Sequence, residues 1–367
     1  MLTIGVDAHK RIHMAVAVDT AGHEVARWRG ANSVEGWRQA AAWAAALGGD
    51  VHWGLEGAWN YGRGLAQQLV AAGATVYEVN PRWTAEGRRR ARRTDKNDRR
   101  DARAVALLVW REAAALPVVA ADDETAVLDL LVTEREAAIA EATRLRNQAH
   151  QLLLQLDPDY GQHLPRLRTK AGARALEAYT TADPHPLQQQ RAAAVRRLAR
   201  RLRLALEPAR DLASQLRALA APRFAPLAGI CGVELLTAAA LAGICGVELL
   251  TAAALAGILG PGRRFATDAQ LAAYAGVAPL EASSAERARH RLNRGGNRRL
   301  HAILYRVALT QTRASPLAQA YLARRISAGK TRREAIRARK RHLARVIWRA
   351  CQACQRSADG VPTSVAT

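Results

Sequence analysis

The sequence predicts an α/β domain at the N-terminus, followed by a chain that is mostly α-helical. Three observations support this division. The first hundred residues alternate strand and helix patterns, the composition changes near residue 124 to Ala, Leu, Arg and Glu, and apolar residues then recur at heptad spacing. The 367 residues are enough for two or three domains, each with a core of its own.

The N-terminal elements come in an informative order. The predicted elements are strands at 3–6, 12–18 and 24–28, a helix at 34–47, a strand at 51–55, a helix at 61–72, a strand at 75–79 and a helix at 98–113. Three strands followed by alternating helices and strands are typical of an RNase H-like domain. This is an analogy of fold, which carries no chemistry by itself.

Two heptad seams predict long helices after this domain. The first seam contains Leu128, Arg135, Ala142, Ala149 and Leu156, with Leu131, Ala138, Leu145 and Leu152 between them; the second contains Val195, Leu202, Ala209 and Leu216, with Leu198, Ala205, Leu212 and Leu219. Pro208 is expected to kink or interrupt the second helix. The pair predicts an antiparallel hairpin, with its apolar seam facing either its own chain or another subunit.

An internal repeat follows the second helix. The segment LAGICGVELLTAAA at Leu227–Ala240 recurs unchanged at Leu241–Ala254 and begins again at Leu255. Each copy predicts a helix-hairpin-helix unit, whose glycine turn offers backbone N–H groups to a DNA phosphate. Because 14 residues are close to four helical turns, the extra copy rotates the apolar face by only about 40°.

The charge balance predicts a polyanionic partner. The chain has 55 Lys and Arg against 32 Asp and Glu, a formal net charge of +23. Most of the excess is arginine, whose planar guanidinium suits phosphate oxygens, and solvated helix faces are the alternative for any one cluster. No apolar segment of about 20 residues and no secretory leader is present, so we expect a cytoplasmic protein associated with the nucleoid and not a membrane protein. Cys351 and Cys354 form an isolated C-x-x-C pair, which favours reduced cysteines over zinc.

Acidic residues on three predicted elements suggest a metal site. Asp7 is the acid of an otherwise apolar strand, Glu56 ends another strand before Gly57, and Asp98 and Asp101 share one face of a helix at its first turn. Two-metal cleavage of a phosphodiester needs carboxylates from several elements that hold two ions about 4 Å apart. Helix capping for the two helix acids and buried salt bridges for the two strand acids are the alternatives. Asp95 is a nearby substitute for either helix acid.

A basic loop follows in the C-terminal part, GVAPLEASSAERARHRLNRGGNRRLH. Its Pro, Ser and Gly content predicts a loop, and its arginines predict an anionic ligand. Ser283 and Ser284 offer hydroxyl groups, nearby arginines could hold a scissile phosphate, and metal-bound oxygen could assist removal of the serine proton. Helix capping is the alternative role. The candidate nucleic-acid-binding residues are Arg287, Arg289, Arg291, Arg294 and Arg298 here, with Arg88 and Arg92 in the N-terminal domain.

The combination IGVDAHK, GLEG, D-x-x-D-A and GVAP…SS…RGGNRRL resembles the DEDD-type transposases of bacterial insertion sequences, insertion sequence family 110. The resemblance spans nearly the whole chain. It implies a RuvC-like catalytic domain at 1–118, a coiled-coil hairpin at 119–225, a C-terminal transposase domain at 226–350 and a tail at 351–367. It also implies that Asp7, Glu56, Asp98 and Asp101 hold magnesium as two ions. It further implies that Ser284, followed here by Ala285, attacks DNA to form a phosphoserine link.

The resemblance further implies partners. A noncoding RNA of the element would pair with donor and target DNA, and the protein would act as a homodimer or homotetramer. Two alternatives from other classes stay open. One is a metal nuclease similar to Holliday-junction resolvases, which hydrolyses DNA with water. The other is an inactive nucleic-acid-binding relic of a transposase.

Overall fold

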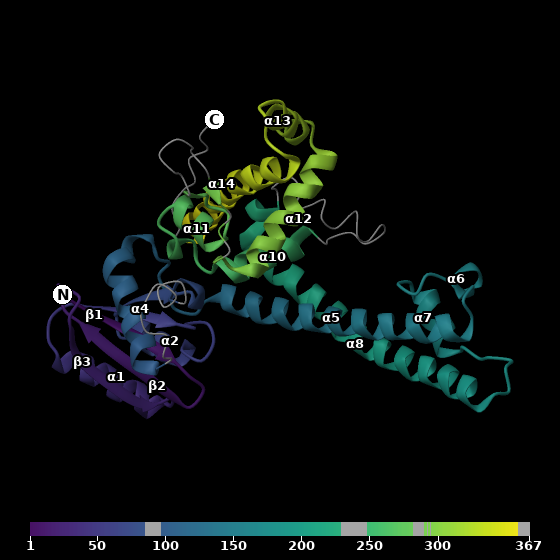
Figure 1. Cartoon of the computed structure of the whole chain (residues 1–367), viewed down its shortest axis with the longest axis horizontal. Coiled ribbons are helices and arrows are strands. Elements are labelled where there is room, and N and C mark those ends of the chain that lie inside the picture. Colours follow the sequence, from purple (N-terminus) through teal and green to yellow (C-terminus); the bar gives the residue numbers. More distant parts are fainter. Residues whose placement is uncertain (85–96, 229–247, 282–289, 292, 294, 359–367) are drawn as a thin grey trace.

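The computed structural model describes residues 1–84, 97–228, 248–281, 290–291, 293 and 295–358. It contains an N-terminal part built on a sheet, a long arm of two helices, and a C-terminal part made of helices (Figure 1). The arm extends away from both other parts, which lie against each other at its base. The chain is therefore mixed α/β at its N-terminus and mostly helical elsewhere, as predicted.

The N-terminal sheet has five strands in the order β3-β2-β1-β4-β5. The strands are β1 (Leu2–Ala8), β2 (Ile12–Val18), β3 (Glu24–Ala31), β4 (Val51–Glu56) and β5 (Thr75–Val79). The first three strands are antiparallel neighbours, whereas β4 runs parallel to β1 and β5 parallel to β4. This order and the positions of the strands match the prediction for an RNase H-like domain.

Helices cover both faces of this sheet. Helices α1 (Val34–Ala46) and α2 (Arg63–Ala71) pack on one face, where their alanines and leucines meet Ile4, Val6 and Leu55. Helix α4 (Asp98–Glu112) packs on the opposite face against β1, β2 and β4. A 3-10 turn at Ala113–Ala115 ends it. Successive side chains of a strand point to opposite faces, so each strand supplies residues to both layers.

The arm consists of α5 (Glu124–Leu156) and α8 (Pro186–Ala228), joined through α6 (Tyr160–His163) and α7 (Lys170–Glu177). The two long helices run antiparallel, because Glu124 at the start of α5 pairs with Arg223 near the end of α8. Small and branched side chains at the predicted seams are buried between them. At 1.5 Å per residue the 33 residues of α5 span about 50 Å.

Pro208 does not interrupt α8. The helix is continuous from Pro186 to Ala228, and its backbone leaves helical φ/ψ values only at Phe224. The predicted interruption is therefore wrong. A proline within a helix costs about 3 kcal/mol, but Ala205, Ala209 and Leu212 are all buried around it. Their packing against the rest of the molecule offsets the lost hydrogen bond.

The C-terminal part has its core around α10 (Glu248–Leu259), which packs on both arm helices. The other elements are the 3-10 turn Gly262–Arg264, α11 (Asp268–Tyr274), the strands β6 (Leu280–Glu281) and β7 (His290–Arg291), and the helices α12 (Arg298–Ala314), α13 (Pro316–Ser327) and α14 (Arg332–Ala358). Gly257 lets α10 approach α5 closely, because a Cβ there would lie 2.6 Å from the amide nitrogen of Asp129. The end of the second repeat copy and the beginning of the third thus form one continuous helix. Most of the first copy lies outside the described residues.

Arg264 joins the N-terminal and C-terminal parts. It is fully buried and pairs with Glu78 of β5, while its guanidinium also donates to the carbonyl oxygen of Ile258 at 2.9 Å. The rings of Trp59 and Tyr274 each lie 4.8 Å from the guanidinium carbon. The Arg264 cation therefore contacts residues of both parts, and these contacts favour one relative orientation of the two parts.

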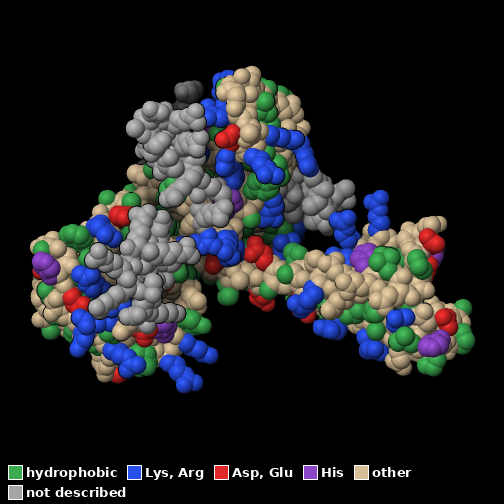
Figure 2. All heavy atoms as spheres, viewed as in Figure 1, with side chains coloured by type: hydrophobic (Ala, Val, Ile, Leu, Met, Phe, Trp, Pro, Cys, Tyr) green, Lys and Arg blue, Asp and Glu red, His purple; other side chains and the backbone are tan. Residues whose placement is uncertain are grey.

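Arginine and lysine side chains are spread over the N-terminal part, the arm and the C-terminal part in the view of Figure 2. Among the described residues, no helix is both long and apolar enough to span a bilayer. Cys351 and Cys354 lie on α14 and form no disulfide with each other. The surface thus agrees with the expectation of a polyanionic partner.

Candidate active site

Two glycines allow helix α4 to lie directly on the central strands. Gly5 of β1 and Gly54 of β4 are partners in the parallel register. A Cβ at Gly5 would overlap the backbone of Ala102 and Ala106, and one at Gly54 would overlap the side chain of Val109. Any larger residue at Gly5 would push α4 away from the sheet, because helix backbone cannot move aside as a side chain can.

Two acids follow these glycines on the same face of the sheet. Asp7 and Glu56 are register partners at the carboxyl ends of β1 and β4, each two residues after its glycine. Since residues two apart in a strand face the same way, both acids lie on the side that α4 covers. Helix α4 begins with Asp98, and Asp101 is buried in its first turn. The fold therefore brings the three predicted acidic elements to one edge of the sheet.

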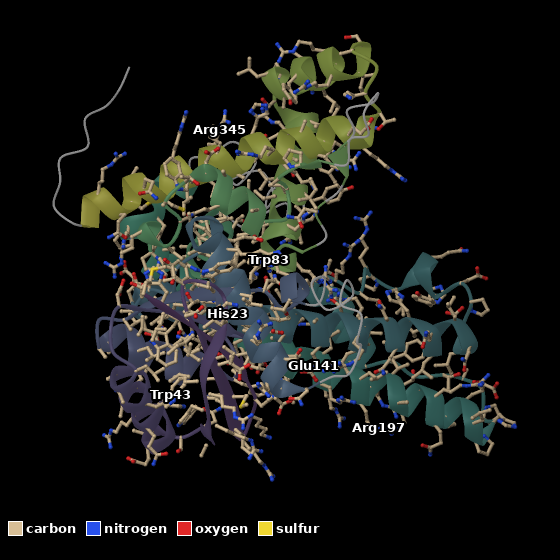
Figure 3. All side chains as sticks on the ribbon, turned by 60° about the vertical axis from the view of Figure 1, so that its left-hand side comes forward. His23, Trp43, Trp83, Glu141, Arg197 and Arg345 are labelled. Atoms are coloured by element: carbon tan, nitrogen blue, oxygen red, sulfur yellow. The ribbon has the colours of Figure 1, made fainter. Side chains whose placement is uncertain are left out.

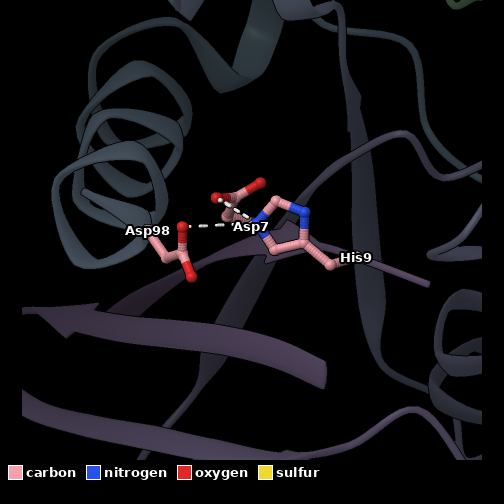
Figure 4. A group of neighbouring side chains, drawn as sticks. All are labelled: Asp7, His9 and Asp98. Carbon is pink, nitrogen blue, oxygen red and sulfur yellow. Dashed lines mark ion pairs between the residues drawn. The ribbon is translucent and has the colours of Figure 1, made fainter. Parts of the chain in front are cut away.

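His9 lies between two of these carboxylates (Figure 4). Its Nε2 atom is 3.1 Å from Oδ2 of Asp7 and 3.5 Å from Oδ1 of Asp98. One ligand atom from each of the three residues lies within 4.8 Å of the others. The prediction from sequence missed His9. Its position two residues after Asp7, on the same side of an extended chain, is the signal that could have found it.

The electrostatics of Asp7 fit a cation at this edge. Burial raises the pKa of Asp7, His9 lowers it, and the carboxylates of Asp101 and Asp98 raise it, so the pKa lies above its ordinary value. Carboxylates that share a buried site repel each other unless a positive charge lies between them. Magnesium and manganese bind carboxylate oxygens, and manganese also accepts imidazole nitrogen. The donor set thus fits a divalent metal ion.

Asn32 holds the backbone that carries His9. Its Nδ2 atom donates to the carbonyl oxygens of His9 and Lys10, both at 3.3 Å, and to that of Tyr61 at 3.2 Å. Its Oδ1 atom accepts a hydrogen bond of 2.9 Å from the indole of Trp37. These bonds connect the segment after β1 to α1 and to the segment before α2. His9 is therefore placed by the fold of the domain and not by its own strand alone.

Glu56 is held by the segment that follows β5. Thr84 donates to Oε2 of Glu56 at 3.0 Å and also to the carbonyl oxygen of Pro81. Gly57, next in the chain, has a φ of 73° and open space where a Cβ would be. Gly57 therefore makes the turn directly after Glu56, because residues other than glycine rarely adopt this positive φ.

The segment Asn80–Thr84, which we call the β5 turn and which is helical from Pro81 to Thr84, also contacts the C-terminal part. Asn80 donates to the carbonyl oxygen of Gly295 at 2.7 Å. Trp83, labelled in Figure 3, lies beside the same glycine, since a Cβ at Gly295 would be 3.0 Å from its indole nitrogen. One short turn therefore touches Glu56 at one end and the RGGN segment of the predicted serine loop at the other.

Most of the predicted serine loop and its basic residues lie outside the described residues. Arg298 is described and exposed as the first residue of α12, and Arg291 belongs to β7. Outside the described residues are Ser283, Ser284, Arg287, Arg289, Arg294, Arg88, Arg92 and Asp95. The structure brings together Asp7, Asp98 and the unpredicted His9, with Glu56 and Asp101 beside them.

Comparison with known proteins identifies two matching segments. Residues 4–158 match the family model of DEDD transposases of the IS110 type, described as Transposase, and residues 238–323 match the model described as Transposase IS116/IS110/IS902 family. No curated protein matches the chain. The second match includes only residues 238–240 of the first repeat copy and all of the second copy. The second copy is thus the one that corresponds to the family pattern.

Proposed function

The chain belongs to the IS110 family of transposases, and we propose that it cuts and rejoins DNA strands with a magnesium-dependent acidic site and a serine nucleophile. The observation that carries the proposal is the convergence of Asp7, His9 and Asp98, with Glu56 in register beside Asp7. Such a set of carboxylates, with an imidazole nitrogen beside them, on a sheet edge under a helix is suited to metal-assisted phosphodiester chemistry.

The proposed ligands are Asp7, Glu56, Asp98 and Asp101, with His9 next to two of them. When bound, magnesium ions neutralise charge on the phosphate and on the oxygens that attack and leave. In this chain, β1 and β4 position Asp7 and Glu56, and Gly5 lets α4 bring its two acids close. Thr84 orients Glu56 by donating to its carboxylate. These residues would fix the arrangement of the carboxylates that bind the metal.

Ser284 is the proposed nucleophile, with Ser283 as the alternative. The serine hydroxyl gives up its proton as its oxygen forms a bond to phosphorus, one bond from phosphorus to a sugar oxygen breaks, and that sugar oxygen takes up a proton and leaves as a hydroxyl, so one proton is released and one is consumed. Support comes from the described residues next to this loop, because Gly295 accepts a hydrogen bond from Asn80 of the β5 turn, which also carries the partner of Glu56. Gly295, at the described end of the loop, is therefore held by the same segment that contacts Glu56.

We further propose that a noncoding RNA of the element supplies sequence specificity and that the protein acts as a homodimer or homotetramer. The excess of 55 Lys and Arg over 32 Asp and Glu supports binding of several nucleic-acid strands. Leucines that remain exposed on the arm, Leu130 on α5 and Leu204 on α8, support packing of the arm against another subunit. The domain boundaries 1–118, 119–225, 226–350 and 351–367 remain proposals.

The decisive experiment combines purified protein, magnesium, DNA of the element ends and the candidate RNA, and detects covalent protein–DNA adducts on denaturing gels. Asp7→Asn should lower adduct formation on the order of a thousandfold, since several kcal/mol of transition-state stabilisation depend on the metal. Ser284→Ala should abolish the adduct. Asp211→Asn, which removes an exposed acid from α8, is the matched control and should retain activity.

Other outcomes point elsewhere. If Ser283→Ala abolishes the adduct and Ser284→Ala does not, Ser283 is the nucleophile. If both serine variants cleave DNA as well as the unmodified protein does and no adduct forms, water is the nucleophile, as in a resolvase-like nuclease. If the unmodified chain binds DNA without cutting it, the protein is an inactive relic.

A further inference from the structure

A basic pocket of about 860 Å³ lies between helices α12 and α14. Five cationic side chains and a single carboxylate, that of Glu334, belong to the described lining. The cations are Arg82, Arg298, Arg333, Arg337 and Lys340. Glu334 already accepts hydrogen bonds of 2.8 Å from the backbone and the hydroxyl of Thr331. Glu334 also pairs with Arg337 at 3.6 Å, so one carboxylate stands against five cations and the pocket keeps an excess of positive charge.

Lys340 is the unusual member, because it is only 4% exposed. Its Nζ atom lies 2.8 Å from Nε2 of His301, whose Nδ1 lies 3.2 Å from the carbonyl oxygen of Ala275. A carbonyl oxygen can only accept, so Nδ1 carries the proton and Nε2 accepts from Lys340. An ammonium group has three donors, and His301 takes one of them.

No carboxylate compensates this buried charge among the described residues, since none of their salt bridges includes Lys340. Burial, and then the neighbouring Arg337, lower the pKa of Lys340 to about 8, so it still carries a proton at pH 7. Burial and Lys340 together lower the pKa of His301, which keeps the imidazole neutral. A buried cation without an anion destabilises a fold, and such a group is retained where a ligand supplies the anion.

We propose that this pocket binds a backbone phosphate of a nucleic-acid strand, with Lys340 as the donor at its base. Arg298, Arg333 and Arg337 are exposed around it and suit the flanking phosphates. That the phosphate belongs to a nucleic acid rests on the proposed function, whereas the anion site itself rests on the pocket.

The position of the pocket indicates which strand it holds. Its lining includes Asn293 and Gly296, which border the predicted serine loop, and Arg82 of the β5 turn, whose Thr84 contacts Glu56. A phosphate bound here lies beside Asn293 and Gly296 and beside Arg82, two residues before the Thr84 that contacts Glu56. The pocket therefore anchors the strand next to the phosphodiester that is cut, and Lys340 is a positioning residue for the reaction.

The test compares Lys340→Gln with Arg349→Gln in the full chain. Glutamine keeps an N–H donor for His301 but removes the charge, so the variant should fold and resist heat at least as well as the unmodified protein. Arg349 is exposed on the same helix, outside the pocket, and controls for net charge. Fluorescence anisotropy at pH 7 should show about tenfold weaker binding of a 20-nucleotide DNA or RNA strand by Lys340→Gln. The Arg349→Gln variant should change binding by about twofold or less.

Two further measurements identify the phosphate. A strand whose linkages are uncharged methylphosphonates should bind Lys340→Gln and the unmodified protein equally. Affinity of the unmodified protein for the ordinary strand should fall about tenfold from pH 7 to pH 9, because Lys340 loses its proton, and should stay flat for the variant. The charged and titratable groups around Lys340 come from every element that lines its two cavities, and all are shared by both proteins. They are Arg298, His301 and Tyr305 from α12, Arg325 from α13, Lys330, Arg333, Glu334, Arg337, Arg341 and His342 from α14 and the residues before it, and Arg82 from the β5 turn.

Equal binding of the ordinary strand by Lys340→Gln and the unmodified protein overturns the proposal. So does a defect of Lys340→Gln that appears with a poly-glutamate peptide and not with either strand, which would indicate a protein partner. Failure of the proposed function has a different signature. In that case Asp7→Asn would still form adducts while Lys340→Gln would still weaken strand binding.

Discussion

The acidic edge and the basic pocket each bury a charged side chain near others of the same sign, negative at the edge and positive in the pocket. At the edge, Asp7 is buried near other carboxylates, and its pKa is raised. In the pocket, Lys340 is buried near Arg337, and its pKa is lowered. Each site gathers charges of one sign from distant parts of the chain, which costs stability until an ion of the other sign arrives. A metal cation suits the first site and a phosphate suits the second.

The two regions differ in how they are built. The acidic edge rests on strand register, in which Asp7 and Glu56 are paired by the parallel ladder. The pocket rests on helix packing, in which residues 39 apart in sequence, His301 and Lys340, meet across α12 and α14. A sheet fixes its side chains more rigidly than two helices do. We therefore expect the edge to tolerate substitution of its backbone-packing residues less well.

The largest expected effect is that of Gly5→Ala. The new Cβ overlaps the backbone of α4, so the free energy of unfolding should fall by about 3 kcal/mol or more, and adduct formation should fall with it as Asp98 and Asp101 move away. Urea unfolding measures the first effect. Gly161→Ala, where a Cβ meets nothing within 4 Å, is the control. Unchanged stability in Gly5→Ala would show that the edge is not rigid.

The next effect concerns the pH dependence of stability. A pKa lowered from 10.5 to about 8 means that the unfolded chain binds the Lys340 proton first as pH falls. Lys340 should therefore reduce the free energy of unfolding by about 3 kcal/mol as pH falls from 10.5 to 8, with no further loss below pH 8. Urea midpoints of the unmodified protein and Lys340→Gln should diverge over this interval. If the urea midpoints of the two proteins changed in parallel with pH, the charge of Lys340 would be neutralised by another group in the fold. The comparison with the acidic edge would then not hold.

The smallest effect is expected from Asn80→Ala. It removes the hydrogen bond of 2.7 Å from Asn80 to Gly295 and the exposed one of 3.0 Å that Oδ1 of Asn80 accepts from the backbone N–H of Arg82. The link to Gly295 is worth about 1 kcal/mol, so adduct formation should fall about fivefold with a small loss of stability. Asn147→Ala, on an exposed face of α5, is the matched control. Full activity in Asn80→Ala would indicate that the edge and the serine loop do not depend on this link.

The sequence was enough to predict the N-terminal fold, because period-two and helical patterns are local. It also predicted that Asp7 and Glu56 would meet, since both end strands that share one edge. His9 was missed because the apolar pattern that drew attention to β1 stops at Ala8. Gly5 and Gly54 were missed because nothing in a single strand shows that a helix backbone will lie on it.

The remaining features depend on contacts that no local pattern encodes. Pro208 is helix-breaking by propensity, and only the packing around α8 overrides it. The sequence around Lys340 predicts a basic helix with exposed cations. Lys340 is buried only because α12 and α14 pack around it. The approach of the β5 turn to Gly295 joins residues 215 apart, which only the assembled chain can bring together.

Arg264 has a consequence for how such proteins can be recombined with one another. Its guanidinium contacts Glu78 and Trp59 of the N-terminal part and Tyr274 of the C-terminal part. Each part therefore supplies contacts that the other lacks at this interface. In a chimera whose first 118 residues come from a different relative, Arg264 stays buried, and the carboxylate that pairs with it must come from the substituted N-terminal part. The two halves are therefore constrained to change together, and a graft succeeds only when the glutamate and the arginine are transferred as a pair.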